Sequence, residues 1–162
     1  MSRRAAAALV VLAAVVAAAV LVPLLALGSS GKPRLSRDAY ARSVTTVFAN
    51  LGRQFHAAPA GAAPAETSAS LASMKAALDR ATARLRALEP PSDADRRHRV
   101  LVSATHDYAR QVDLVRASVD LGDPVTIATH LRDVVAPDVI QRTIRSLNAS
   151  GYRIPVTVVA LH

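Results

Sequence analysis

The chain of 162 residues contains no cysteine and no tryptophan, and its glycine, glutamate and aromatic residues are scarce. Without a thiol there is no disulfide framework, no thiolate metal site, no cysteine nucleophile and no thioether-linked lipid. The five aromatic side chains do not alternate with basic clusters, so a base-stacking surface for nucleic acid is not expected. The length fits one domain of ordinary size.

Catalytic signatures are also missing. The sequence has no phosphate-binding glycine loop, no dinucleotide fingerprint and no nucleophile elbow. Its six glycines leave little of the loop flexibility on which most active sites rely. We therefore expect a protein that is not an enzyme and that carries no cofactor.

One long apolar run stands near the start of the chain. Residues 5–27 consist of ten Ala, six Val, six Leu and one Pro, with Arg3 and Arg4 directly before them. A helix of that length spans roughly 34 Å, more than the ~30 Å hydrocarbon core of a bilayer. Residues 1–28 are therefore predicted to be a signal-anchor, with the membrane contact made by residues 5–27. Small residues precede a possible cleavage site after Gly28. The alternative is therefore a signal peptide that is cleaved there, which would make the protein a secreted one.

The charges beside the apolar run predict its orientation. Arg3 and Arg4 favour an N-terminus inside the cell, and so short a leader is easily kept there. The rest of the chain then lies outside the cytoplasmic membrane, as the domain of a single-pass membrane protein. Basic residues on the other flank oppose this orientation, namely Lys32, Arg34, Arg37 and Arg42.

The chain is strongly basic, with a formal net charge of +8, and nearly all of its basic residues are arginine. Such a charge favours contact with an anionic surface, either lipid headgroups or an acidic partner. The alternative is an ordinary solvated face. The residues expected to make the contact follow the apolar run or open a predicted helix: Lys32, Arg34, Arg37, Arg42, Arg96, Arg97 and Arg99. No nucleic acid is expected, because the predicted topology keeps the domain out of the cytoplasm.

Apolar residues recur at helical spacing through residues 36–151, which predicts an all-α fold, an antiparallel bundle of four to five helices. Residues 29–35 are predicted to be a polar juxtamembrane hinge. Ser36 is expected to cap the first helix, which ends near His56. The apolar stripe of this helix comprises Tyr40, Val44, Val47, Phe48, Leu51 and Phe55.

The second helix is predicted to follow a loop over residues 57–65 and to be capped by Thr67 or Ser68. It ends before Pro90 and Pro91. Its apolar residues recur every three or four positions, the repeat by which coiled-coil helices pack at a shallow angle. They are Leu71, Met74, Leu78, Ala81, Leu85 and Leu88.

The third helix is expected to begin at a Ser92 cap and to end at Gly122 in the left-handed conformation. Its apolar stripe comprises Leu101, Thr105, Tyr108, Val112, Val115 and Val119. Asp123 and Pro124 then cap and begin the next helix. Its apolar pattern of Val125, Ala128, Leu131 and Val135 is interrupted at Pro137 and resumes with Val139, Ile140, Thr143, Ile144 and Leu147. The interruption leaves open whether the two pieces form one kinked helix.

The end of the chain has a different composition. Residues 152–162 are rich in β-branched side chains, with no evident partner strand. We predict an extended apolar tail that lies along the bundle or frays.

One cluster offers a possible ligand or metal site. Asp95 and His98 are three residues apart, which places a carboxylate and an imidazole on one helix face. His106 and Tyr108 are the further candidates, and a ligand- or metal-binding bundle is the alternative function. Only two glutamates are present, both at predicted helix ends. Boundary histidines are therefore the simpler interpretation, and no metal is expected.

A broader pattern resembles small exported helical proteins of actinobacteria. It consists of Leu85-x-x-Leu88-x-Pro90-Pro91, then His98, Leu101, Val102 and Tyr108, and finally the Gly122-Asp123 break. The resemblance covers residues 70–152 approximately. It implies an all-helical extracytoplasmic domain and transfers no activity and no catalytic residue.

Many of those proteins carry a lipoprotein cysteine, which this chain lacks, so anchoring falls to residues 5–27. The expected function is a membrane-tethered helical module that binds a protein or a cell-envelope component.

Overall fold

The computed structural model describes residues 32–56 and 63–155. The apolar run, the possible cleavage site and residues 156–162 of the predicted tail lie outside the described residues. The chain divides into two compact units, Met1–Pro33 and Arg34–His162. All the helices described below belong to the second unit. No helix within the described ranges is long and apolar enough to cross a membrane.

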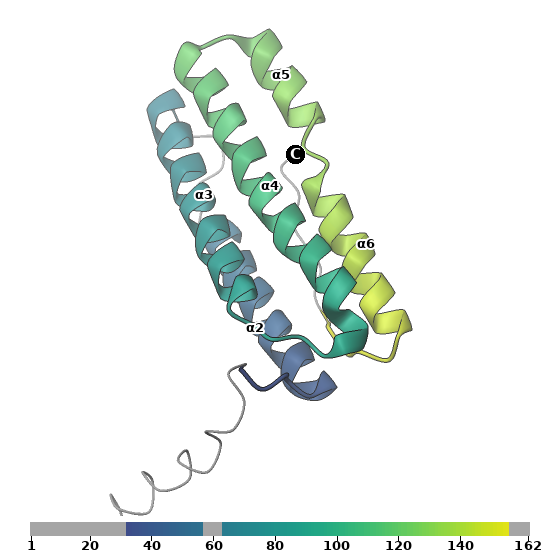
Figure 1. The fold of residues 1–162 in the computed structure, drawn as a ribbon. Helices are drawn as coiled ribbons and strands as arrows, with labels where there is room; N and C mark the ends of the chain where they lie inside the picture. The colour runs from purple at the N-terminus through teal and green to yellow at the C-terminus, as the bar shows by residue number, and fades with distance from the viewer. Residues whose placement is uncertain (1–31, 57–62, 156–162) are drawn as a thin grey trace, which may run out of the picture. The chain divides into compact units, whose positions relative to one another are not determined.

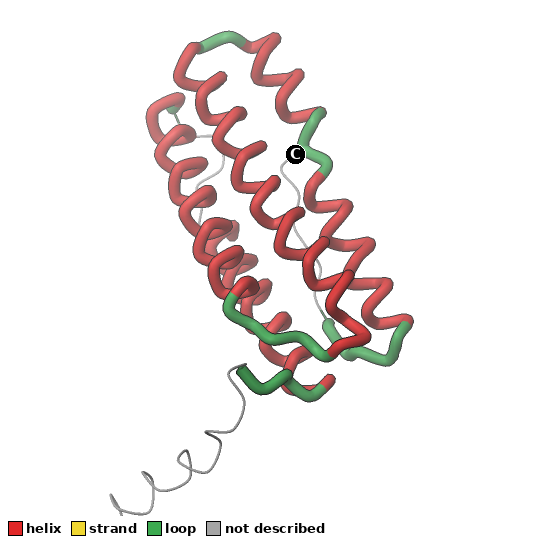
Figure 2. The backbone as a smooth tube through the Cα atoms, viewed as in Figure 1, coloured by secondary structure: helices red, strands yellow, loops and turns green. Residues whose placement is uncertain are grey.

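The second unit is a helical bundle, which confirms the all-α prediction. Its elements are α2 (Arg37–His56), α3 (Pro64–Arg86), the 3₁₀ turn η2 (Ser92–Ala94), α4 (Asp95–Leu121), α5 (Pro124–Arg132) and α6 (Ala136–Ala149). Consecutive long helices run antiparallel, and α5 and α6 follow one another along α4 (Figure 1). Loops join the helices, and none of the described residues in Figure 2 forms a strand.

The first two helices begin where the local chemistry satisfies their free N–H groups. The Oγ of Ser36 accepts a hydrogen bond from the N–H of Ala39 at 3.2 Å, which confirms the predicted cap of α2. The start predicted for α3 is wrong. Pro64 occupies its first turn, and the Glu66 carboxylate accepts from the N–H of Ala63 at 3.3 Å. Proline and an acidic side chain in the first turn therefore extend the helix into the predicted loop.

The beginning of α4 also differs from the prediction. Ser92 does not cap the helix, because Ser92–Ala94 forms a 3₁₀ turn and α4 starts at Asp95. The other end is as expected: Gly122 has φ of 67°, a left-handed conformation that costs glycine little. Asp123 then accepts from the N–H of Val125 at 3.0 Å and caps α5.

The core lies between α2, α3, α4 and α6, where the predicted stripes of the first three helices meet. Tyr40, Leu78, Leu101 and Ile144 are at most 1% exposed. The stripe predicted for α5 is wrong, because no α5 residue is buried and Val125 remains 73% exposed. The break at residues 133–135 separates α5 from α6, so the two are distinct helices; α6 places buried residues in the core, whereas α5 packs only the partly buried Leu131 against it.

The first residues of the predicted tail fold back onto the bundle. Tyr152 and Ile154 are buried. The Asn148 side chain donates to the carbonyl oxygen of Ile154 at 3.1 Å and accepts from its N–H at 2.9 Å. Residues 152–155 are neither helix nor strand.

Candidate functional site

Side chains from three separate stretches of sequence converge at one end of the bundle, and we call this group the clamp. It comprises Arg34–Tyr40, Glu89–His98 and Tyr152–Ile154. The N–H of Leu35 donates to the carbonyl oxygen of Glu89 at 2.9 Å. The predicted hinge over residues 29–35 therefore does not extend to Arg34 and Leu35, which are held on the bundle.

Two ion pairs fasten the outer part of the clamp. An Arg34 nitrogen lies 2.9 Å from an Asp95 oxygen, and an Arg37 nitrogen lies 2.7 Å from an Asp93 oxygen. Hydrogen bonding to Arg34 lowers the pKa of Asp95. The pKa of Asp93 is lowered by the hydrogen bond from the Tyr152 hydroxyl, at 2.9 Å, together with the charge of Arg37.

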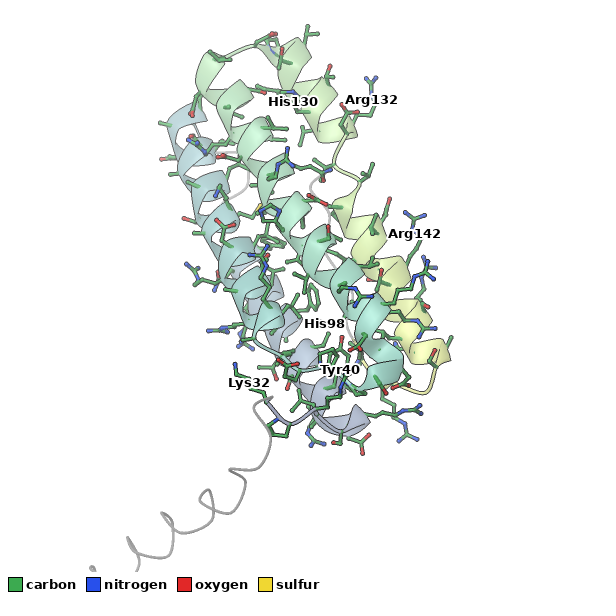
Figure 3. The ribbon with its side chains drawn as sticks, in the orientation of Figure 1. Lys32, Tyr40, His98, His130, Arg132 and Arg142 are labelled. Carbon is green, nitrogen blue, oxygen red and sulfur yellow. The ribbon has the colours of Figure 1, made fainter. Side chains whose placement is uncertain are left out.

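The inner part of the clamp is a buried pair, Tyr40 and His98. The Tyr40 hydroxyl lies 3.2 Å from Nδ1 of His98, and both residues are buried (Figure 3). Burial lowers the pKa of His98 and raises that of Tyr40, which keeps both groups neutral near pH 7. The negative charges of Asp95 and Glu89 act on His98 in the opposite direction. The hydrogen bond between these two neutral side chains joins α2 to α4, so the pair has a structural role.

Two of the candidate metal ligands already have partners within the clamp, and the others lie outside it. Asp95 is paired with Arg34, and His98 with Tyr40. His106 lines a shallow depression with His98, where two guanidinium groups, those of Arg86 and Arg99, disfavour a cation. Across the ranges 32–56 and 63–155, no three His, Asp or Glu side chains gather in a way that would hold a metal ion.

Tyr108, the remaining candidate ligand, is completely buried beside Phe55, with the ring centroids 6.0 Å apart. It therefore belongs to the core.

The arginines predicted to contact an anionic surface do not form one patch. Lys32, Arg34, Arg37 and Arg42 are all exposed, but Arg34 and Arg37 are ion-paired within the clamp. Arg99 lies on the α3 side of α4. Arg96 and Arg97 lie on its other side, facing α6.

A long groove runs between α4 and α6, and we call it the α4–α6 groove. It consists of two hollows of about 600 and 440 Å³ that share Val100 and Val139. The first is lined by Asp93, Arg96, Arg97, Val100, Val139, Arg142, Thr143 and Ser146. The second is lined by Val100, Ser103, Ala104, Asp107, Arg110, Gln111, Leu114, Val135, Ala136 and Val139.

Three of the five exposed large apolar side chains of the described residues line this groove, and the other two, Leu121 and Val125, lie beside the turn between α4 and α5. Val100, Leu114 and Val135 are 40%, 50% and 55% exposed, and all three line it. The equivalent space between α2 and α3 is only about 30 Å³. There Arg80 donates to the Gln54 side chain at 3.1 Å, which bridges the two helices.

Sequence reasoning missed this groove, although a signal for it is present. The α4 residues that line it recur at helical spacing: Arg96, Arg97, Val100, Ser103, Ala104, Asp107, Arg110, Gln111 and Leu114. This is a second heptad-like stripe beside the buried one. Because this stripe contains both polar and apolar residues, the spacing of apolar residues alone does not reveal it.

The comparisons with known proteins found nothing similar. No protein-family model matches the chain, no curated protein matches it, and no solved structure matches it. The resemblance to exported actinobacterial proteins therefore stays a prediction.

Proposed function

We propose that the chain is a membrane-tethered helical module of the extracytoplasmic side, which binds a protein or a cell-envelope component and catalyses no reaction. Residues 5–27 provide the tether, and the bundle provides the binding surface. The observation that carries this proposal is the α4–α6 groove, in which exposed apolar side chains lie among arginines. Apolar surface in a concave setting is typical of binding sites.

The short connection between tether and bundle supports a role beside the membrane. The apolar run ends at Leu27, and the clamp begins at Arg34. A chain extends by at most ~3.6 Å per residue, so these seven steps reach about 25 Å. A retained tether therefore limits the bundle to partners close to the bilayer surface.

The use of polar groups within the fold supports a role without catalysis. Every buried side-chain nitrogen and oxygen of the described residues has a hydrogen-bond partner. Within residues 32–56 and 63–155, the contact that most resembles a nucleophile and base is that of Ser118, whose Oγ lies 2.6 Å from Nδ1 of His130. Ser118 is 1% exposed and already donates to the carbonyl oxygen of Leu114 at 2.9 Å. Its hydroxyl thus fastens α5 to α4.

Labelling of single cysteines tests the topology, because the native chain has none. Ser103→Cys places a thiol at an exposed position of α4, and Ser2→Cys places one before the apolar run. A membrane-impermeant maleimide applied to intact cells is expected to label Ser103→Cys and to leave Ser2→Cys unlabelled. The reverse pattern would overturn the orientation.

Fractionation and intact mass test the tether itself. The native protein is expected in the membrane fraction and is expected to resist carbonate extraction. Its intact mass is expected to be that of the chain that begins at Met1. A mass beginning at Ser29, together with release from the membrane, would replace the tethered form with the secreted one. Recovery of the unprocessed chain dissolved in the cytoplasm would overturn the proposed function.

A further inference from the structure

We infer that the α4–α6 groove is the docking site for an acidic amphipathic helix of a partner protein. The inference rests on the proposed function and names the class of partner. Three properties of the groove carry it: its spacing along α4, its charge and its shape.

The spacing suits a helix as the occupant. The lining positions of α4 form one stripe from Arg96 to Leu114, in which Arg97, Val100, Ala104, Asp107, Gln111 and Leu114 follow one another in steps of three and four. A helix packs along another helix through such a repeat, with its own residues entering the spaces between the lining side chains. From Arg97 to Leu114, α4 rises by roughly 25 Å, the length of a partner helix with four to five turns.

The floor of the groove provides the apolar part of the contact. Val100, Leu114 and Val135 are exposed, and Val139 packs partly against the core. Val100 and Val139 belong to both hollows and face each other from α4 and α6. A partner helix with apolar residues at i, i+3, i+4 and i+7 covers this strip along its length.

The charge of the groove selects an acidic partner. Four arginines line it, Arg96, Arg97, Arg110 and Arg142, against two aspartates. One of these, Asp93, is already bonded to Arg37 and Tyr152. Arg97 donates to the Ser146 hydroxyl at 2.9 Å, so this arginine of α4 is tied to α6. Arg142, labelled in Figure 3, lines the first hollow from α6.

Two other occupants fit less well. A second copy of the chain in a two-fold contact through this groove would bring the same arginines against each other. A lipid surface would meet the arginine rim but would leave the concave apolar floor uncovered. The acidic helix matches both the rim and the floor.

A synthetic peptide tests the inference with the full chain in nanodiscs of uncharged lipid. The probe is a helix of about 20 residues with Leu and Ile on one face and Glu on both sides of that face. The control peptide has the same composition in scrambled order. Fluorescence anisotropy of the labelled peptides is expected to show binding of the amphipathic probe alone, and weaker binding at high salt.

Charge reversal on the protein identifies the surface. Arg96→Glu with Arg142→Glu changes two exposed rim arginines, and affinity is expected to fall about tenfold or more. The matched control, Arg84→Glu with Arg145→Glu, makes the same change of net charge outside the groove and is expected to weaken binding less than about twofold. Unchanged circular dichroism verifies that all variants fold.

Several results would overturn the inference. Equal losses in the two double variants would mean general attraction to a basic protein, and equal binding of the scrambled peptide would mean that no helix is recognised. A fluorophore on Ser103→Cys that responds to anionic lipid but not to the peptide would assign the groove to headgroups. Concentration-dependent dimers that are lost when a charge is placed on the apolar floor, in Val100→Glu, would assign it to a second copy. These readouts do not depend on cellular location, so they fail or succeed separately from the proposed function.

Discussion

The two ends of the bundle differ in how their segments are held in place. At the clamp, segments that are more than fifty residues apart in sequence are joined, as in the pairs Arg34–Asp95 and Tyr152–Asp93. At the other end, α5 has no buried residue and is fastened to α4 by the contact between Ser118 and His130 (Figure 3).

The difference shows that two consecutive helices packed along α4, namely α5 and α6, can differ in stability. Both α5 and α6 begin with a proline in the first turn and pack on α4, but only α6 places a buried stripe in the core. Segments with few buried apolar contacts open more readily than the rest of a protein. We therefore expect α5 to be the most easily opened helix among those described.

The largest expected effect is a difference in the free energy of unfolding between two leucine-to-alanine variants, one in α6 and one in α5. Leu147 in α6 is fully buried, whereas Leu131 in α5 is only partly buried. Leu147→Ala is expected to lower the free energy of unfolding by about 2–5 kcal/mol, and Leu131→Ala by about 1 kcal/mol or less. Urea unfolding of the full chain in detergent measures both values. Equal losses would contradict the contrast between the helices.

The next effect concerns the attachment of the tail at the clamp end. Asn148→Ala removes both hydrogen bonds to the backbone of Ile154, each worth about 0.5–1.5 kcal/mol, so a loss of about 1–3 kcal/mol is expected. Asn148→Asp retains an acceptor for the N–H of Ile154 and is expected to lose less. Hydrogen exchange at Ile154 reports the release directly. Unchanged protection in Asn148→Ala would show that burial of Tyr152 and Ile154 suffices.

A smaller effect is expected where α5 begins. Gly122 has a positive φ and open space where an alanine methyl group would stand, so Gly122→Ala meets backbone strain alone, about 1 kcal/mol. Hydrogen exchange should accelerate in α5 and remain unchanged in α6. Acceleration of both helices to the same degree would show that they open together.

The smallest effect follows from the titration of His98. Burial lowers its pKa below the ordinary 6.5, so the unfolded chain binds the proton more strongly than the folded one. This contribution to stability is complete above about pH 7 and is lost as the pH falls through 6.5 towards the folded-state value. His98→Gln should reduce the fall in Tm between about pH 7 and pH 5.

The carboxylates of the clamp titrate in a separate window. The pKa values of Asp93 and Asp95 are lowered from 3.8, so their contribution is present above that pH and lost below it. A fall in Tm near neutral pH that persists in His98→Gln would show that His98 is not its source.

Much of the fold could be predicted from local patterns. The buried stripes of α2, α3 and α4, the Ser36 cap and the Gly122 break follow from spacing and backbone chemistry within a few residues. The stripe of α5 follows the same rule, yet none of its residues is buried. Periodicity shows which face of a helix is apolar, but whether that face is covered depends on the neighbours that the chain supplies.

The candidate site was less predictable. The spacing of Asp95 and His98 correctly placed them on one helix, but it could not show that each bonds to a residue about sixty positions earlier, Arg34 and Tyr40 respectively. Likewise, Arg96 and Arg97 were identified as a basic run, whereas Arg110 and Arg142 join them only because α6 lies beside α4.

By itself, the sequence determined the helical class, the basic character and the absence of thiol chemistry, because these depend on composition and on spacing along one segment. The tertiary structure alone decided which charges are neutralised in the clamp and which remain around the α4–α6 groove. The physical reason is that ion pairing, burial and concavity arise between segments, and their partners are chosen by packing across distances that no local pattern records.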